Sequence, residues 1–305
     1  MASSPRFITH AFAGNPLDRA GDRRGDADWI ARQLEAPKAR ALVLWKGQPL
    51  LKPGPELVFI EGAVASKLAE TGEHLLFLGL NGDDAVFALE IEGEADPTQG
   101  PLEGYGQFHE MRAAAGALPL PDTGLLSASR SLFEWRRRHR YCANCGHATN
   151  GVDGGWKRQC PNCNAQHFPR VDPCVIMLPT FEDRCLVGHQ AAWAANRYSA
   201  LAGFVEAGES VEEACAREVK EEAGLTVTAV RYHSSQPWPY PSNLMLGLIC
   251  EVSDDQAQPD LTELDSVRWL TRAEALKLAD GKADGISGPP PFAIAHSLIK
   301  GWAEG

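Results

Sequence analysis

Apolar residues occur in short blocks over the first 125 positions. Four apolar runs, at 41–45, 56–60, 74–80 and 85–91, are separated by Gly, Pro and polar residues. Runs of this length bounded by turn residues are typical of β-strands. Asn81-Gly82 joins the last two runs, and this dipeptide favours a hairpin. The pattern predicts a β-rich N-terminal domain over residues 1–125. It contains no catalytic constellation, so we expect it to act as a scaffold or in dimerisation.

The pattern changes after this domain. From Leu125 to Arg140 the composition suits a connecting helix, which we assign to residues 126–140. Its basic end, 136–140, is a candidate for phosphate binding, although a solvated face is the favoured interpretation. From residue 167, a bend followed by a buried strand, a hairpin partner at 184–190 and two further strand-like runs at 226–236 and 244–252 predict a compact α/β domain. A final helix is expected from about Pro291 to Trp302.

A helix with an unusual face is predicted between the strands of this last domain. Ser210 and Glu213 have the spacing of a capping box, and Gly224 occupies the position of a left-handed C-terminal cap. A rotation of 100° per residue brings three carboxylates to the apolar side of the helix, namely Glu218, Glu221 and Glu222. Buried carboxylates are costly unless they are paired or bind cations, so the pattern predicts a divalent metal site. The alternative is a surface helix with a rotated face.

Four cysteines form a second metal-like pattern at 141–168. Cys142 and Cys145 are followed after fourteen residues by Cys160 and Cys163. Two CxxC pairs at this spacing predict one structural Zn²⁺ with a closed tetrahedral site, and a redox pair is the disfavoured alternative. His147 and His167 are spare ligand candidates that we expect to be surface residues. Such a ribbon is also typical of modules that bind nucleic acid or protein.

Composition narrows the class of protein. The 305 residues include 29 Lys and Arg against 40 Asp and Glu, which gives a net charge of −11. An acidic chain is not a general nucleic-acid coating protein, because phosphate binding depends on Lys and Arg. No apolar run reaches the 18 residues of a membrane-spanning helix, and the N-terminus lacks the pattern of a signal peptide. We therefore expect a cytoplasmic protein without a membrane partner, whose four remaining cysteines are buried thiols.

A proline-rich stretch lies between the last two strand-like runs. Three prolines alternate with other residues in 235–243, SQPWPYPSN, so we expect a stiff loop and not a strand. The rigid rings of Trp238 and Tyr240 are candidates for contact with a planar base. A packed structural loop is the alternative explanation.

Two motifs resemble those of a known family. Residues 203–225, GFVEAGESVEEACAREVKEEAGL, match the signature of the Nudix hydrolases at every specified position. SQPWPYPSN closely resembles the SQPWPFPxS motif of the NADH pyrophosphatase branch, whose members carry a four-cysteine ribbon before the catalytic domain. Tyr240 and Asn243 depart from that motif. The resemblance implies an α+β protein with a Nudix α/β/α sandwich over 169–305, preceded by the zinc ribbon and the β-rich domain.

The resemblance also implies a reaction and a ligand set. Members hydrolyse the pyrophosphate of NADH, and NAD⁺ more weakly, to the mononucleotides, and some remove NAD caps from RNA 5′ ends. Two or three Mg²⁺ or Mn²⁺ ions are expected on Glu218, Glu222 and the carbonyl of Ala202. Glu221 is expected to bind metal or act as the base. The remote acidic ligand is expected at Glu263, six residues before Trp269, with Asp260 and Asp265 as competitors.

The remaining implied residues contact the substrate. These candidate positions are Phe168, Phe204, Gln236, Pro237, Trp238, Pro239, Tyr240, Pro241, Ser242, Asn243 and Ala295. Gly155 falls where some relatives carry an acidic contact. Arg217 is expected to pair with acids and not with substrate. Family members suggest a homodimer. The alternatives are a Nudix enzyme that prefers ADP-ribose or a diadenosine polyphosphate, and a zinc-ribbon RNA-binding or regulatory protein with an inactive Nudix site.

Overall fold

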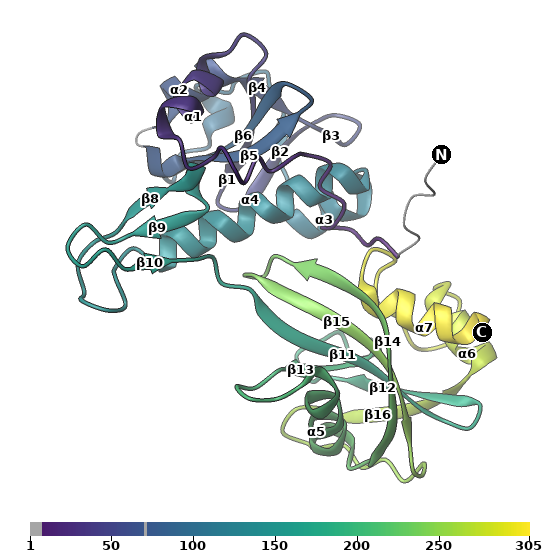
Figure 1. Ribbon diagram of the computed structural model, residues 1–305. Helices are drawn as coiled ribbons and strands as arrows, with labels where there is room; N and C mark the ends of the chain where they lie inside the picture. The colour runs from purple at the N-terminus through teal and green to yellow at the C-terminus, as the bar shows by residue number, and fades with distance from the viewer. Residues whose placement is uncertain (1–7, 70–71) are drawn as a thin grey trace, which may run out of the picture. The chain divides into compact units, whose positions relative to one another are not determined.

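The computed structural model describes residues 8–69 and 72–305, which divide into two compact units (Figure 1). We call residues 12–170 together with 238–242 the N-terminal unit. Residues 8–11, 171–237 and 243–305 form the C-terminal unit.

The N-terminal unit is built around a seven-stranded mixed sheet with the order β3-β2-β1-β6-β5, to which β4 and β7 add through β1 and β2. Its strands are β1 (Arg40–Trp45), β2 (Gln48–Lys52), β3 (Glu56–Leu57), β4 (Phe59–Glu61), β5 (Leu75–Asn81), β6 (Asp84–Ile91) and β7 (Gln107–Phe108). The four predicted strand regions are confirmed, and the run at 56–60 is split into β3 and β4. The predicted hairpin is also confirmed, because Asn81 pairs with Asp84 and Gly82 has φ 63°.

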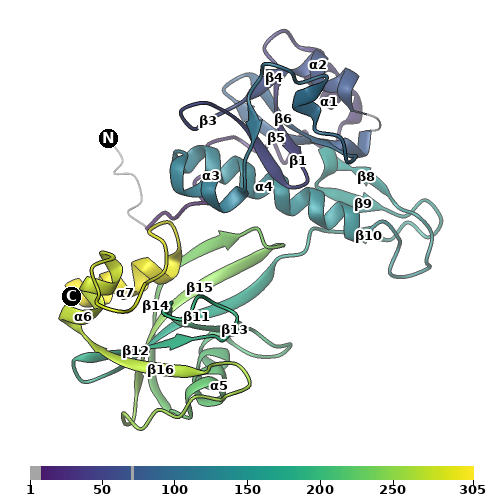
Figure 2. The ribbon, with the colours of Figure 1, turned by 180° about the vertical axis from the view of Figure 1, so that it is seen from behind.

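Helices pack around this sheet, and the last of them leads into the zinc ribbon. They are α1 (Ala27–Glu35), α2 (Gly62–Leu68), α3 (Met111–Ala117) and α4 (Leu120–Arg138). The first of these begins with an Asp26 side-chain cap. Helix α4 begins five residues before the predicted Leu125, since Pro121 is tolerated in its first turn. It runs along the sheet, and β8 (Asn150–Val152), β9 (Lys157–Gln159) and β10 (Gln166–His167) lie beside its C-terminal end (Figure 2).

The basic end of α4 is neutralised by acids of its own unit. Arg136 is buried and donates to Glu73, which also accepts from Arg158 of the ribbon. Arg137 and Arg138 pair with Glu134. The favoured interpretation of a solvated face therefore fails for Arg136, because its guanidinium ties α4 to Glu73 and to the Leu75 carbonyl at the start of β5.

The C-terminal unit contains a six-stranded sheet with the order β14-β15-β11-β12-β16, and β13 pairs with β11. Its elements are β11 (Asp172–Phe181), β12 (Arg184–His189), β13 (Leu201–Phe204), α5 (Val211–Ala223), β14 (Val227–Trp238), β15 (Asn243–Val252), β16 (Ser266–Thr271), α6 (Arg272–Ala279) and α7 (Ile294–Glu304). The predicted hairpin of β11 and β12 is confirmed. The last helix begins at Ile294, three residues later than expected.

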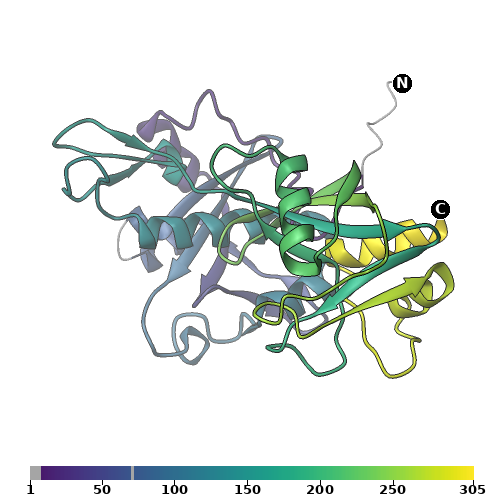
Figure 3. The same ribbon diagram turned by 90° about the horizontal axis from the view of Figure 1, so that it is seen from below.

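Alternate residues of the central strands face two different helices. Val175 and Met177 of β11 form one core with Ala214 and Val219 of α5. On the other face, a Cβ atom at Gly247 of β15 would lie 2.9 Å from Ile294 of α7. Since successive side chains in a strand point to opposite faces, α5 and α7 lie on opposite sides of the sheet (Figure 3). This is the predicted α/β/α arrangement.

The proline-rich stretch differs from its prediction. Strand β14 continues through Ser235 to Trp238, and β15 begins at Asn243, so only 239–242 connect them. Pro237 is tolerated within a strand because β14 lies at the edge of the sheet, where a missing N–H breaks no inner ladder. Among the described ranges, no helix is long and apolar enough to cross a membrane.

Candidate active site

Helix α5 has the ends that its sequence predicts. The Ser210 hydroxyl accepts from the Glu213 N–H at 3.2 Å, and the Glu213 carboxylate accepts from the Ser210 N–H at 2.8 Å. Gly224 closes the helix with φ 70°. These caps fix the two ends of the helix, and the packing of Ala214 and Val219 in the core sets the direction of its acidic side chains.

Two of the three predicted carboxylates are buried. Glu218 is 8% exposed and Glu222 is 2% exposed, whereas the side chain of Glu221 is 57% exposed. The prediction that Glu221 lies on the apolar side is wrong in position, since it projects to solvent beside Arg217. Burial and the charge of Glu218 raise the pKa of Glu222 to about 8.

The strand that precedes α5 makes room for its first acid. Gly203 of β13 pairs with Val175, and a Cβ atom at Gly203 would lie 1.8 Å from the carboxyl carbon of Glu218. Only glycine permits this approach of backbone and carboxylate. The first glycine of the signature is therefore required by the position of Glu218.

Arg217 ties the signature loop to the helix, as predicted. Its guanidinium donates to both oxygens of Glu209 at 2.7 and 2.9 Å and to the carbonyl of Phe204 at 2.9 Å. It also donates to Glu218 and Glu221 at 2.8 and 2.9 Å. The hydrogen bonds that Arg217 donates to Glu209 lower the pKa of Glu209 to about 2. Arg217 thereby helps to orient Glu218.

The buried acids fit a divalent cation. Glu222 Oε2 is buried and has no hydrogen-bond partner in the structure, although a buried carboxylate oxygen is costly to leave unsatisfied. Glu222 also receives a backbone hydrogen bond from Ala202, whose carbonyl is the predicted third ligand. Hard oxygen donors of this kind suit Mg²⁺ or Mn²⁺.

Glu263 fits the remote acidic position better than its two competitors. Asp260 uses Oδ1 to accept from the Thr262 N–H at 2.9 Å, and Asp265 pairs with His189. Glu263 is exposed, and its charge adds to burial in raising the pKa of Glu218 and of Glu222. The charge of Glu263 therefore acts on both buried acids, which Asp260 and Asp265 are not found to do.

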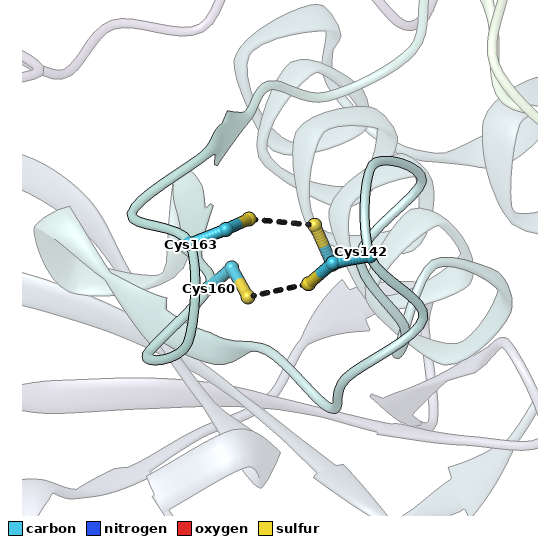
Figure 4. Close-up of side chains that lie close together, drawn as sticks. Cys142, Cys160 and Cys163 are labelled. Carbon is cyan, nitrogen blue, oxygen red and sulfur yellow. Dashed lines mark hydrogen bonds between the residues drawn. The ribbon is translucent and has the colours of Figure 1, made fainter.

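The four predicted zinc ligands come together in the ribbon. Their Sγ atoms lie within 4.8 Å of one another, with Cys142 3.6 Å from Cys163 and Cys145 3.5 Å from Cys160 (Figure 4). The set is closed, which suits a structural Zn²⁺. His167 does not join it as a fifth member, and its Nε2 lies 3.3 Å from the sulfur of Cys142.

Gln236 has an interior position. It is fully buried, its Nε2 donates to the carbonyls of Ala11 and Phe292, and its Oε1 accepts from the Ile294 N–H at the start of α7. Both N–H groups of the amide and its oxygen thus have partners inside the protein. The structure therefore gives the amide a clamping role in place of the expected substrate contact.

The tip of the proline-rich stretch is part of the N-terminal unit. Arg130 Nε of α4 donates to the Pro239 carbonyl at 2.8 Å, and its guanidinium lies 4.8 Å from the ring centre of Tyr240. Arg112 lies 4.5 Å from the same ring, and Phe12 lies 5.7 Å from Trp238. The alternative of a packed structural loop accounts for these positions.

The other expected substrate residues differ in exposure. Phe168 is 65% exposed and Phe204 is 55% exposed, so both rings are accessible. Ala295 and Ser242 are buried, which leaves little of either for a ligand. The remaining positions are Pro237, Pro239, Pro241 and Asn243, and they are partly or fully buried.

His189 makes a long-range contact that the sequence did not predict. It lies at the end of β12, 5% exposed, and pairs with Asp265, which is 76 positions away in the chain. A single histidine after a strand has no motif, so only the fold reveals the pair.

Comparison with known proteins agrees with this geometry. Family models match as a NUDIX domain over residues 169–287, an NADH pyrophosphatase zinc ribbon domain over 137–168 and an NADH pyrophosphatase-like rudimentary NUDIX domain over 38–135. The NAD-capped RNA hydrolase NUDT12 of Macaca fascicularis is 33% identical over 98% of this chain and 76% of its own length. The human mitochondrial NAD(P)H pyrophosphatase NUDT13 is 36% identical over 90% of this chain and 80% of its own.

A bacterial relative extends the same match. The NAD-capped RNA hydrolase NudC of Deinococcus radiodurans is 33% identical over 87% of each chain. The matches span the N-terminal domain, the ribbon and the signature helix together. The chain therefore belongs to the NADH pyrophosphatase branch of the Nudix hydrolases.

Proposed function

We propose that this protein hydrolyses the pyrophosphate bond of NADH, and of NAD⁺ more weakly, to a nicotinamide mononucleotide and AMP. The observation that carries the proposal is the buried, unpartnered oxygen of Glu222 beside Glu218. Arg217 pairs with Glu218, but one oxygen of the buried Glu222 has no partner. Two such acids suit a reaction on an anionic diphosphate only when divalent cations are held there.

Each acidic residue has a distinct role. Glu218 and Glu222 hold Mg²⁺ or Mn²⁺ from the helix, with the Ala202 carbonyl, and Glu263 approaches from the segment before β16. The cations, when bound, lower the pKa of water and withdraw charge from the pyrophosphate. Arg217 keeps Glu218 in place through the hydrogen bond at 2.8 Å. Glu221 is exposed and pairs with Arg217. It serves either as an additional metal ligand or as the general base.

The zinc ribbon supplies structure and not chemistry. Four thiolates leave no open position on Zn²⁺ for water or substrate. Glu73 connects the ribbon to the sheet of the N-terminal unit through Arg158 and the Gly151 N–H. The ribbon therefore stabilises this unit.

NAD-capped RNA is a second candidate substrate. Two of the relatives above are named NAD-capped RNA hydrolases, and the other is named an NAD(P)H pyrophosphatase. A cap joined to RNA carries the same pyrophosphate as the free dinucleotide, so one set of acids serves both. The homodimer is implied by the family resemblance alone, and the cytoplasmic location is a prediction from the sequence.

A substrate comparison tests the proposal. We would measure kcat/KM in Mn²⁺ for NADH, NAD⁺, ADP-ribose, a diadenosine polyphosphate and NAD-capped RNA, with the Glu222→Gln variant as the control. We expect NADH to exceed NAD⁺ and ADP-ribose. A large preference for ADP-ribose or the diadenosine compound would replace the proposed substrate, and no hydrolysis of any of them would favour a binding protein with an inactive site.

A further inference from the structure

The segment that carries Glu263 is held at both ends. At one end, the Asp260 N–H donates to the carbonyl of Glu222 at 3.0 Å, so the segment begins against the last turn of α5. At the other end, the Asp265 N–H donates to the carbonyl of His189 at 3.1 Å. Between these points the Leu264 N–H donates to the Asp260 carbonyl at 2.8 Å, which closes a turn. Glu263 thus projects from a short turn between two fixed points.

His189 makes the second of these attachments with its side chain as well. Its Nδ1 hydrogen-bonds Oδ1 of Asp265, and its Nε2 lies 3.0 Å from the carbonyl of Ala194. Both partners are acceptors, so the two contacts are strongest when both ring nitrogens carry a proton. The imidazole is 5% exposed, whereas the Asp265 side chain is 48% exposed, so only the ring is shielded from water.

The surroundings of the ring fix its orientation. The Tyr198 ring lies 5.6 Å from the imidazole, and the Tyr198 hydroxyl lies 3.0 Å from the Ser266 hydroxyl of β16. Leu264 is 2% exposed and packs beside Gly188, where a Cβ atom would lie 3.1 Å from its side chain. The residue that follows Glu263 is therefore packed in the interior, while the Glu263 side chain itself stays exposed.

We propose that the His189–Asp265 pair is a positioning device that sets Glu263 for divalent-cation binding beside Glu218 and Glu222. The two residues touch neither cation nor substrate. They act through the backbone of the turn, in the way that residues behind metal ligands orient those ligands. The inference rests on the proposed metal-dependent function.

Direct Mn²⁺ binding without substrate tests this inference. We would measure the dissociation constant by calorimetry for the wild type, Asp265→Asn and His189→Gln. Loss of the pair should weaken Mn²⁺ binding about 10-fold, as outer-shell substitutions do. Asp255→Asn is the matched control, because Asp255 pairs at 2.9 Å with Arg184, which lies at the opposite end of β12 from His189. It should leave the dissociation constant unchanged.

A double-mutant cycle separates positioning from general destabilisation. In the Glu263→Gln background, Asp265→Asn should produce no further loss of Mn²⁺ affinity, because the ligand that it positions has been removed. An unchanged affinity of Asp265→Asn, or an equal loss in both backgrounds, would overturn the inference. The Asp265 side chain is 48% exposed, so this variant is expected to fold even if His189→Gln does not. Because metal binding is measured, a wild type that binds Mn²⁺ but ignores NADH would refute the substrate and not the positioning role.

Discussion

The backbone of Gly203 lies directly against the carboxylate of Glu218, and a Cβ atom there would lie 1.8 Å from the carboxyl carbon. Gly203→Ala should therefore displace Glu218 and lower kcat on the order of 100-fold, since small misplacements of reacting groups have effects of this size. The circular dichroism spectrum should stay that of the wild type. Gly21→Ala is the matched control, because a Cβ atom there meets nothing within 4 Å. Equal activity of the two variants would contradict the close approach.

Removal of the buried carboxylate of Glu222 should lower activity without lowering the stability of the metal-free protein. Glu222→Gln keeps the shape of the side chain but removes the charge that burial disfavours, so the metal-free protein should unfold at the same or a higher temperature. Its kcat should fall by at least about 100-fold, because a metal-ligand oxygen is lost. Thermal melts with and without Mn²⁺, together with steady-state rates, measure both effects. Glu212→Gln, an exposed position in the first turn of α5, serves as the control.

If Glu222 had a purely structural role, Glu222→Gln would show neither the maintained unfolding temperature nor the large loss of kcat. A variant that turns over NADH at the wild-type rate would remove Glu222 from the site.

The four cysteines of the ribbon predict one bound Zn²⁺ per chain. Cys160→Ser should abolish bound zinc, because a closed four-thiolate site loses a ligand, and should destabilise the N-terminal unit. Cys185→Ser removes a similarly buried thiol from the C-terminal unit and should keep one zinc per chain. Elemental analysis of both purified proteins decides between these outcomes. Full zinc content in Cys160→Ser would mean that the metal is held elsewhere.

The buried ring of His10 should make the folded protein less stable at acidic pH. Its ring is 5% exposed and hydrogen-bonds the Ser234 hydroxyl at 2.8 Å, and burial followed by the charge of His233 lowers the pKa of His10 from 6.5 to about 4. The unfolded chain therefore binds a proton more readily than the folded one between these values. The resulting stability is fully present above pH 6.5 and is lost as the pH falls towards 4, by at most about 3 kcal/mol.

Urea unfolding at several pH values measures this dependence. His10→Gln should have a shallower fall in the free energy of unfolding from pH 6.5 to 4 than the wild type. His109→Gln, which changes an exposed ring, should follow the wild type. Parallel curves for all three proteins would show that His10 titrates normally.

Local signals in the sequence were sufficient for α5, the ribbon and the N-terminal strands. Ser210, Glu213 and Gly224 specify both ends of α5 within fifteen residues, and each CxxC pair forms its own turn. The periodicity was less reliable for Glu221, because its 57% exposure depends on what packs against the helix and not on its angle alone. Short-range patterns therefore predict elements better than they predict the burial of one side chain.

Long-range contacts account for what the sequence did not predict. Gln236 belongs to a motif that implies substrate contact, yet its partners are Ala11 and residues at the start of α7. His189 and Asp265 meet only because β12 and β16 are neighbours in the sheet. Pro237 lies in a strand since that strand is at the sheet edge. Each of these positions depends on the order of strands, which no local pattern contains.

Product analysis of NADH hydrolysis tests the central claim most directly. The purified protein would be incubated with NADH and Mn²⁺, and the products would be separated by chromatography, with a metal-chelated sample as the reference. We predict equal amounts of reduced nicotinamide mononucleotide and AMP, and neither product after chelation. Intact NADH in the presence of Mn²⁺, or cleavage at any bond other than the pyrophosphate, would contradict the account.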